Sequence, residues 1–417
     1  MALRWKNTLW PKVLFFLSVI GPGIIAANAD NDAGGISTYS IVGAHFGTSM
    51  LWILFLLTFS LAVTQEMGVR IGLVTQQGLG GVIREYFGVR WTVFAMVAML
   101  IANMGTIVAE FAGIASSFEL FGITKYLVVP IAAVVVWTVL YKGSFRAAQK
   151  IFLLFSMFYI VYIINGFIVK PDFGLAFKSL ITPQIQWSGT YLLTMIALIG
   201  TTITPWGQFF IQSYVVDKGL NIKHYSVEKW EVFIGALITN VVSFFIIVST
   251  AFTLFQAGIR IHDAKDAAFA LEPLAGHFAE VLFAFGLFSA SMLGAFILPV
   301  ATSYAVCEAL GWEYGFNTNW KNGRMFYSII LFSIILPALI VLIPRLPLVN
   351  VMLLSQDING ILLPIILIFV MLIINNPRIM GAHTNKRWGN AIAWLTIIGI
   401  IFATVLLVVA PLIGLAP

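Results

Sequence analysis

The sequence predicts an all-α, polytopic membrane protein with eleven membrane-spanning helices. Of its 417 residues, 60% are hydrophobic and only 10% are charged, and the mean hydropathy of +0.98 excludes a soluble globular domain. Apolar stretches of about 20 residues, the length of a helix that crosses a bilayer, recur along the whole chain between short polar joints. The distribution of basic residues supports the same count of spans.

None of the apolar stretches is flanked like a cleavable signal peptide, so the first is expected to remain in the mature protein. In chain order the eleven predicted spans cover residues 12–40, 49–74, 91–120, 124–141, 151–169, 189–214, 232–256, 279–310, 326–343, 347–375 and 390–414. The lone cysteine, Cys307, falls inside one of them, which excludes an intrachain disulfide and a cysteine-based metal site.

Lysine and arginine alternate between the joints, as expected when every second joint faces the cytoplasm. Of the 23 basic residues, 17 lie at the N-terminus and in every second joint: Arg4, Lys6, Lys12, Arg70, Arg84, Arg90, Lys142, Arg146, Lys150, Lys218, Lys223, Lys229, Lys321, Arg324, Arg378, Lys386 and Arg387. The pattern predicts an inner-membrane protein with a cytoplasmic N-terminus and an external C-terminus. This topology explains the net charge of +6, so nucleic acid is not expected as a partner.

Two spans are interrupted near their middle. The first contains NADNDAGGIST (residues 28–38), and the sixth contains IGTTITPWGQ (residues 199–208), in which Pro205 breaks the helical pattern. A break that lines a hydrated cavity leaves carbonyl groups free for a cation, and we expect this at Gly34 and Gly35. A proline kink and a close helix crossing at the glycines are the structural alternatives.

Interrupted spans at corresponding positions of two halves are typical of secondary transporters with inverted repeats and a midplane site. The chain shows no linker that would divide it, so we expect one domain over residues 1–417. The two repeats would cover about 10–170 and about 188–376, with an extra helix at about 390–414.

Carboxylates inside the spans are candidate functional groups because they are costly at membrane depth. Asp30 and Asp32 lie in the first interruption, and Asp32, nearest the glycines, is the first choice for a metal ligand. Glu110 lies deep in the third span, where it either lines a polar vestibule or locks the helix bundle. Glu66 and Arg70 have the i, i+4 spacing of a structural ion pair.

A third polar cluster, SQDINGILLP (residues 355–364), interrupts the aliphatic pattern of the tenth span. Gln356, Asp357 and Asn359 either contact a transported species or form a hydrogen-bond network between helices. No hydrolase or nucleotide-binding motif is present, so an enzyme is not expected, and the glycine-rich residues 78–81 are expected to form a loop.

Several of these motifs resemble the natural-resistance-associated macrophage protein (NRAMP) family of divalent metal transporters. That family has Asp-Pro-Gly-Asn in its first broken helix, where this chain has Asp32-Ala33-Gly34-Gly35. The following glycines, the QEMGVRIGLVT that ends the second span and the VAEFAGIASSFELFGI of the third are similar in register. The resemblance implies a leucine-transporter-like fold in which the first and sixth helices are broken.

The chain departs from the family pattern at four positions. Gly35 replaces the family's asparagine, Thr204 replaces a methionine, Trp206 replaces a histidine and Ile107 replaces an acid in the third span. Loss of the thioether leaves an all-oxygen site, which suits hard ions such as Mg²⁺, and the smaller side chains suit a partly hydrated ion. This set of departures resembles the magnesium-transporting branch related to NRAMP proteins.

The resemblance implies an importer of divalent cations, Mg²⁺ or else Mn²⁺, that works by alternating access without tight proton coupling and needs no further cofactor. Asp32, Gly35, Thr201, Thr204, Gln356, Asp30, Asp357 and Asn359 would form the metal site, and Glu110 an electronegative vestibule. Two alternatives stay open: a proton-coupled Mn²⁺/Fe²⁺ importer, and an amino-acid or organic-cation transporter of the same fold. The sequence indicates the bilayer and the metal ion as partners and is silent on protein partners.

Overall fold

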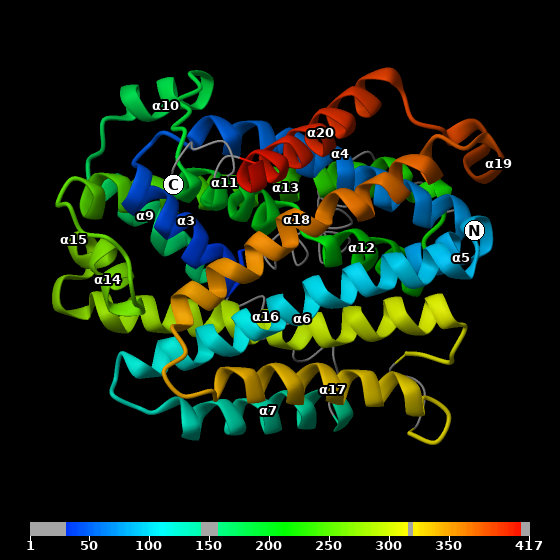
Figure 1. Ribbon diagram of the computed structural model, residues 1–417, viewed down its shortest axis with the longest axis horizontal. Coiled ribbons are helices and arrows are strands. Elements are labelled where there is room, and N and C mark those ends of the chain that lie inside the picture. Colours follow the sequence, from blue (N-terminus) through cyan, green and yellow to red (C-terminus); the bar gives the residue numbers. More distant parts are fainter. Residues whose placement is uncertain (1–30, 143–156, 316–319, 410–417) are drawn as a thin grey trace, which may run out of the picture.

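The computed structural model describes residues 31–142, 157–315 and 320–409, in which every regular element is a helix (Figure 1). Nine spans are long and apolar enough to cross a membrane in this described part. They comprise α4 (Leu51–Thr75), α6 (Val89–Glu119), α7 (Lys125–Lys142), α11 (Gly189–Thr202) with α12 (Pro205–Asp217), α13 (Tyr225–Thr250), α16 (Ala279–Leu310), α17 (Arg324–Val341), α18 (Leu348–Ile374) and α20 (Arg387–Val409).

Two shorter helices belong to the remaining predicted spans. α3 (Ala33–Phe46) is the second half of the interrupted first span, and α9 (Ile160–Ile168) belongs to the fifth. The earlier parts of both spans fall outside the described residues. Each of the eleven predicted spans therefore coincides with a helix wherever the structure describes it, and the all-α prediction is confirmed.

Helices also occupy the joints. α10 (Phe173–Ile181) folds back from α9 at an angle of 120°, and α14 (Ala264–Ala268), α15 (Glu272–Ala275) and α19 (Pro377–Met380) are short turns. The loop expected at residues 78–81 is wrong, because α5 (Leu79–Phe87) begins there. A Cβ at Gly80 would lie 2.8 Å from the carbonyl oxygen of Ala305, so this glycine allows close helix packing.

The helices pack around α3 and the α11–α12 span. α7 and α17 lie side by side at one edge, α6 and α16 come next, and α4, α13 and α20 lie beyond α18 (Figure 1). Burial follows this order: 89% of the apolar window of α11–α12 is buried but only 22% of that of α20. The broken span is thus central, and α20 faces the surroundings.

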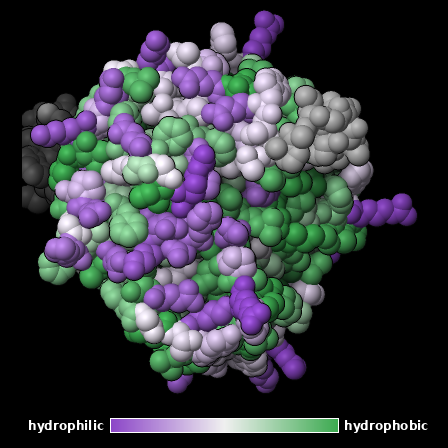
Figure 2. Space-filling view, turned by 60° about the vertical axis from the view of Figure 1, so that its left-hand side comes forward, coloured by the Kyte–Doolittle hydropathy of each residue, from purple (hydrophilic) through white to green (hydrophobic). Residues whose placement is uncertain are grey.

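The surface has separate hydrophilic and hydrophobic regions, as a protein that crosses a membrane requires. Figure 2 brings forward the end that carries α10, α14 and α15, where hydrophilic side chains gather beside a hydrophobic flank. Large apolar side chains such as Val134 of α7 and Leu395 of α20 are 65% and 71% exposed. Exposed apolar surface of this kind is the part that lipid covers.

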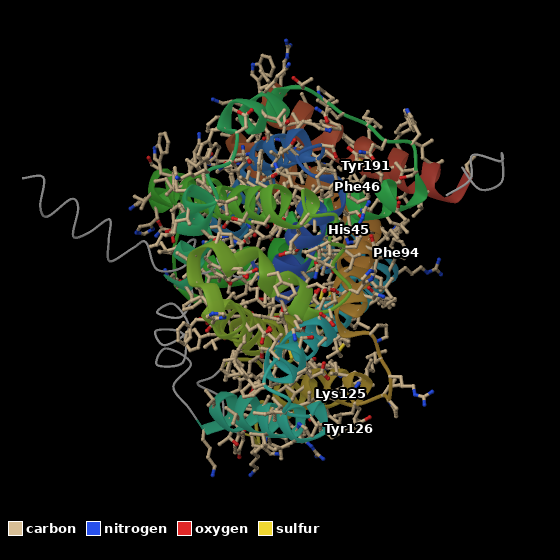
Figure 3. All side chains as sticks on the ribbon, turned by 90° about the vertical axis from the view of Figure 1, so that its left-hand side faces the viewer. His45, Phe46, Phe94, Lys125, Tyr126 and Tyr191 are labelled. Carbon is tan, nitrogen blue, oxygen red and sulfur yellow. The ribbon has the colours of Figure 1, made fainter. Side chains whose placement is uncertain are left out.

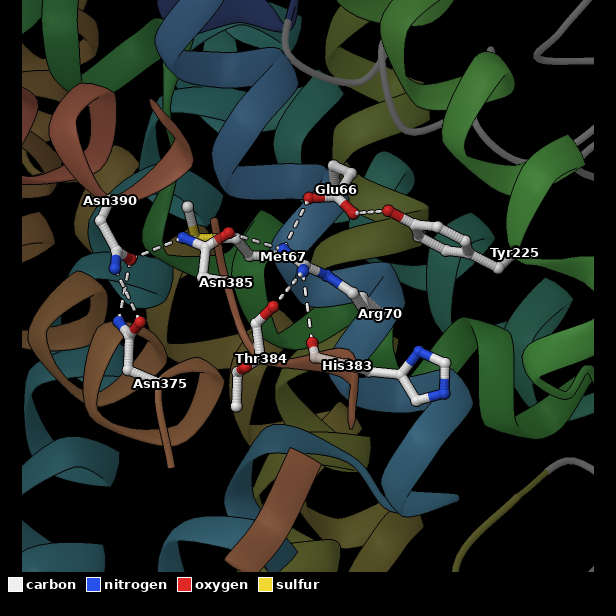
Figure 4. Close-up of polar contacts among 9 residues, drawn as sticks. All are labelled: Glu66, Met67, Arg70, Tyr225, Asn375, His383, Thr384, Asn385 and Asn390. Atoms are coloured by element: carbon white, nitrogen blue, oxygen red, sulfur yellow. Dashed lines mark hydrogen bonds and ion pairs between the residues drawn. The ribbon is translucent and has the colours of Figure 1, made fainter. Parts of the chain in front are cut away.

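A polar network ties α4 to α13 and to the connection between α19 and α20 (Figure 4). Arg70 forms the predicted ion pair with Glu66 at 3.0 Å, and the other Glu66 oxygen accepts a hydrogen bond from the Tyr225 hydroxyl. Arg70 also donates to the carbonyl oxygens of His383 and Thr384 and to Oδ1 of Asn385. The Arg70–Glu66 pair therefore joins α4 to the start of α13 and to the connection between α19 and α20.

Candidate functional site

Asp32 caps the first turn of α3. Its Oδ1 accepts a hydrogen bond from the backbone N–H of Gly35 at 2.7 Å, and the residue is only 2% exposed. Gly34 and Gly35 lie inside the helix, so the expectation that this pair breaks the helix and frees carbonyl groups is wrong. A helix start presents N–H groups, which hold carboxylates such as that of Asp32.

Glu110 reaches the same turn from α6. Its Oε2 accepts a hydrogen bond from the N–H of Ala33 at 3.4 Å, and the side chain is fully buried. Gly294 of α16 has no room for a side chain because the Glu110 carboxyl group occupies that space. The carboxyl groups of Asp32 and Glu110 thus meet at the start of α3. Glu110 lies closer to Asp32 than it would if it lined a separate vestibule.

No basic side chain balances this pair of carboxyl groups among the residues that the structure describes. The ion pairs found there are Arg70 with Glu66 and Lys265 with Glu280, and neither includes Asp32 or Glu110. The same residues also contain no group of three or more His, Cys, Asp or Glu side chains able to hold a metal. Any ion at this site would need amide, hydroxyl or carbonyl ligands as well.

Asn31 positions the chain just before α3. Its Oδ1 accepts a hydrogen bond from Ser243 at 3.1 Å, its Nδ2 donates to the carbonyl of Thr239 at 3.5 Å, and its own carbonyl accepts from Tyr159 at 2.6 Å. These contacts to α13 and to the segment before α9 make Asn31 an anchor. Asp30, which precedes it, lies outside the described residues.

Gln356 lies directly against α3. The first turn of α3 has no room for a side chain at Gly34, because the Gln356 amide nitrogen occupies that space. Asn359 donates to Gln356 Oε1 and to Thr106 Oγ1, both at 2.9 Å. The predicted cluster of α18 is therefore a network that links α3, α18 and α6, with Gln356 at its end nearest Asp32.

Asp357 is placed differently from its neighbours. It follows Gln356 by one residue and is turned about 100° away around α18. It is 6% exposed, and its Oδ1 has no hydrogen-bond partner among the described residues. No contact recorded there joins Asp357 to α3, so its place in the site stays a prediction.

The break in the sixth span is present as predicted. α11 ends at Thr202, and α12 begins at Pro205, with Thr204 as its cap: Thr204 Oγ1 accepts from the N–H of Gly207 at 3.3 Å. The carbonyl group of Thr201, in the last turn of α11, meets no N–H group of the same helix and is therefore available as a ligand. Close backbone contact at Gly200 brings this end of α11 against Gln356.

Sequence reasoning missed Met352. Its sulfur accepts a hydrogen bond from Ser37 of α3 at 3.3 Å, and it lies one helical turn before Gln356. The i, i+4 spacing was a usable signal, because it places both side chains on one face of α18. A thioether is thus present near the site even though Thr204 stands where the family has methionine.

Aromatic and polar contacts surround the C-terminal end of α3. His45, Phe46 and Tyr191 lie together (Figure 3), with the Phe46 and Tyr191 rings edge to face at 5.3 Å. His45 Nε2 accepts from the N–H of Ile261, and Arg260 donates to the His45 carbonyl. Nε2 of His45 carries no proton in this arrangement, because it accepts the hydrogen bond.

The comparison with known families agrees with this geometry. A family model described as "Natural resistance-associated macrophage protein-like" matches residues 23–410. The chain belongs to this family. It is therefore a multi-pass membrane protein of a transporter family and not an enzyme, as the sequence predicted.

The relatives that have a name or a solved structure share little sequence identity with this chain. The "Divalent metal cation transporter MntH" of Klebsiella pneumoniae is 22% identical over 405 residues, which are 95% of each chain. A crystal structure of a manganese transporter from Eremococcus coleocola matches with a TM-score of 0.76 at 19% identity, over 98% of this chain and 88% of that one.

The fold likeness extends further. The structure of MhsT in complex with L-phenylalanine matches with a TM-score of 0.60 at 18% identity, over 92% of this chain and 97% of that one. These likenesses show the leucine-transporter-like fold that the sequence predicts. They show the fold and do not identify a transported ion.

Proposed function

We propose that this NRAMP-family protein imports divalent cations, Mg²⁺ in the first place, by alternating access around Asp32. The observation that carries the proposal is the pair of buried carboxyl groups, Asp32 and Glu110, which no basic side chain balances in the described part of the chain. When ionised, two carboxylates are matched in charge by one divalent cation. Relatives named as divalent metal cation and manganese transporters support the same class of substrate.

The preference for Mg²⁺ rests on the ligands. The Asp32 carboxylate, the Thr201 carbonyl and the Thr204 oxygen are oxygen donors, which suit a hard ion. The Gln356 amide oxygen, which accepts from Asn359, would add a ligand through its second lone pair. Gly35 leaves the space that an asparagine would fill, so the ion can keep part of its hydration shell. Asp30, Asp357 and Asn359 would add oxygens to this shell, and Glu110 would supply charge.

Tight proton coupling is not part of the proposal. Trp206 and Ile107 stand where the family pattern has a histidine and an acid, so two proton-carrying groups are replaced by side chains that do not titrate. With a cytoplasmic N-terminus in the inner membrane, a divalent cation moving inward gains about 4.6 kcal/mol per 100 mV of membrane potential, twice the single-charge value. That gradient is sufficient to drive uptake.

Manganese is the second candidate because of one observation. The Met352 sulfur lies one turn from Gln356 and adjoins Ser37 of α3. A thioether favours Mn²⁺ over Mg²⁺ when it enters the coordination shell.

The test is flux of Mg²⁺, Mn²⁺ and Ca²⁺ into proteoliposomes that contain a pH dye, with Asp32→Asn and Asp32→Ala as a matched pair. Asparagine caps a helix as well as aspartate does, whereas alanine loses the cap and about 1 kcal/mol of stability. Both variants are expected to lose at least about tenfold of the flux, since both lose the charge, equivalent to about 1.4 kcal/mol.

Normal flux in Asp32→Asn would refute the assigned site. Acidification that accompanies metal uptake in the wild type would favour the proton-coupled alternative. Binding of amino acids without any response to Mg²⁺ or Mn²⁺ would overturn the metal proposal.

A further inference from the structure

An apolar groove of about 600 Å³ lies between α4, α11 and α20, and α20 runs along the edge of the bundle (Figure 1). Exposed side chains of α4 and α20, such as Leu56 (53%) and Leu395 (71%), form its rims, so the groove opens toward the surroundings. Its floor is formed by side chains that are at most 7% exposed: Ile53, Leu57, Leu192, Ile199, Ile400 and Ala403.

The groove offers few polar partners. Among the described residues no charged side chain lines it, and its two hydroxyl groups, those of Ser60 and Thr396, are already bonded. Thr396 Oγ1 donates to Ser60 Oγ at 2.7 Å, and Ser60 Oγ donates to the carbonyl oxygen of Leu56 at 3.2 Å. A polar ligand would lose its hydration in such a groove without replacement. The occupant must therefore be apolar along most of its length.

The length of the groove favours a hydrocarbon chain. From Ile392 to Leu406 it follows 14 steps of α20, which correspond to about 21 Å at a rise of 1.5 Å per residue. The hydrocarbon region of one leaflet is about 15 Å thick, half of that of the bilayer, so a tilted acyl chain matches this length.

One end of the groove lies at the level of lipid headgroups. Trp187 lines this end and is 66% exposed, in the joint before α11 that the charge pattern places outside the cell. Tryptophan is enriched at the membrane interface, where its ring meets the headgroups. The groove thus runs from the outer headgroup level into the membrane, in the direction of an outer-leaflet chain.

The groove borders the first half of the broken sixth span. On one face α11 packs backbone to backbone on α18: a Cβ at Gly200 would lie 2.1 Å from the carbonyl oxygen of Gln356, and one at Gly360 would lie 2.5 Å from that of Ile196. The adjoining face of α11, which carries Met195, lines the groove. Protein interiors are close-packed, so a hollow of this size leaves α11 without contacts on that face unless it is filled.

We propose that the groove binds one acyl chain of a phospholipid from the outer leaflet, and that this chain holds α11 against α18. The bound chain supplies the van der Waals contacts that α4, α11 and α20 do not make with one another. Because α11 ends at the break and carries Thr201, the lipid steadies the half-helix that leads to the site. The inference goes beyond the proposed function and is independent of the transported ion.

Gly399 of α20 permits a test that fills the groove from within. It lines the groove, and a Cβ at this position would meet nothing within 4 Å. Gly399→Leu therefore directs a side chain into the space assigned to the lipid. Ile398→Phe is the matched control, because it adds bulk at the next residue, which is 58% exposed and does not line the groove.

The first experiment detects the chain directly. The protein is reconstituted in bilayers that contain phosphatidylcholine with a diazirine near the end of one acyl chain, and adducts are located by mass spectrometry after illumination. Adducts on Leu192 and Met195 are expected in the wild type and in Ile398→Phe. In Gly399→Leu they should be at least about tenfold fewer, equivalent to about 1.4 kcal/mol of lost affinity. Equal adducts in the three proteins, or none on α11 in the wild type, would overturn the proposal.

The second experiment measures stability and needs no metal. Dioleoylphosphatidylcholine added to the delipidated protein in detergent is expected to raise the Tm of the wild type and of Ile398→Phe, because a ligand of the folded state stabilises it. The rise should be less than half as large in Gly399→Leu. Dihexanoylphosphatidylcholine should act weakly, since its chains are too short to fill the groove.

An equal rise in Gly399→Leu, or equal effects of the two lipids on the wild type, would overturn the lipid site. A dimer, measured by light scattering, that dissociates in Gly399→Leu would assign the groove to a second copy of the chain and overturn the proposal as well. If Gly399→Leu fails to fold, Gly399→Val places a smaller side chain in the groove and takes its part in both experiments.

Discussion

Replacing Arg70 by methionine is expected to destabilise the protein by about 3 to 5 kcal/mol, the cost of removing one partner from a buried ion pair. The side chains of Arg70 and Glu66 are only 9% and 10% exposed, so Glu66 would keep a charge that water cannot reach. The lost hydrogen bonds to His383 and Thr384 add little, because His383 is exposed and its carbonyl can bind water.

The expected shift in Tm follows from the size of the chain. An unfolding entropy of about 2.1 cal/mol/K per residue over 417 residues amounts to roughly 0.9 kcal/mol/K. The loss of about 3 to 5 kcal/mol therefore corresponds to a Tm lower by about 3 to 6 °C. Thermal unfolding of the detergent-solubilised protein, followed by tryptophan fluorescence, measures this shift.

A double-mutant cycle with Glu66→Gln separates the charge from the packing. Glutamine removes the buried charge, so Arg70→Met with Glu66→Gln is expected to recover at least half of the lost Tm. Tyr225→Phe, which removes one hydrogen bond to Glu66, is the control and should cost about 1 kcal/mol. A change below about 1 °C in Arg70→Met, or no recovery in the double variant, would refute the reasoning.

Three further predictions concern the site and its supports. Gly200→Ala is expected to cost about 1 to 3 kcal/mol, because the new methyl group overlaps the backbone of Gln356. Gly399→Ala, with nothing within 4 Å, is its control and should be neutral or stabilising by up to about 1 kcal/mol; similar Tm values for both variants would contradict the packing argument. Thr204→Met is expected to raise the ratio of Mn²⁺ to Mg²⁺ flux at least about threefold, since it adds a soft ligand. Met352→Leu should lower that ratio if its sulfur reaches the ion, and an unchanged ratio would exclude Mn²⁺ coordination by Met352.

The interruption in the first span shows where sequence reasoning stopped. The carboxylate at Asp32 was recognisable because a charge in a long apolar stretch needs a function. The role of Gly34 was not, because it depends on the Gln356 side chain of a helix far away in the chain. Similarly, residues 78–81 suggested a loop, whereas Gly80 serves a close contact with Ala305 of α16.

By itself, the sequence determined which segments form the membrane-spanning helices, because a bilayer demands apolar stretches of a given length and leaves no other structure for them. It also determined the break before Pro205, since proline has no N–H to donate and restricts the residue that precedes it. The ion pair of Glu66 and Arg70 was also predictable, because helix geometry alone brings side chains with i, i+4 spacing together.

Only the tertiary structure decided which faces of these helices meet. Glu110 reaches the N–H of Ala33 across 77 residues of chain, and Ser37 reaches Met352 across 315. Such contacts depend on how each helix is rotated and tilted against its neighbours, which small residues such as Gly34 and Gly294 permit through packing. The period of a hydrophobic helix carries little information about that rotation, because every side of it is apolar.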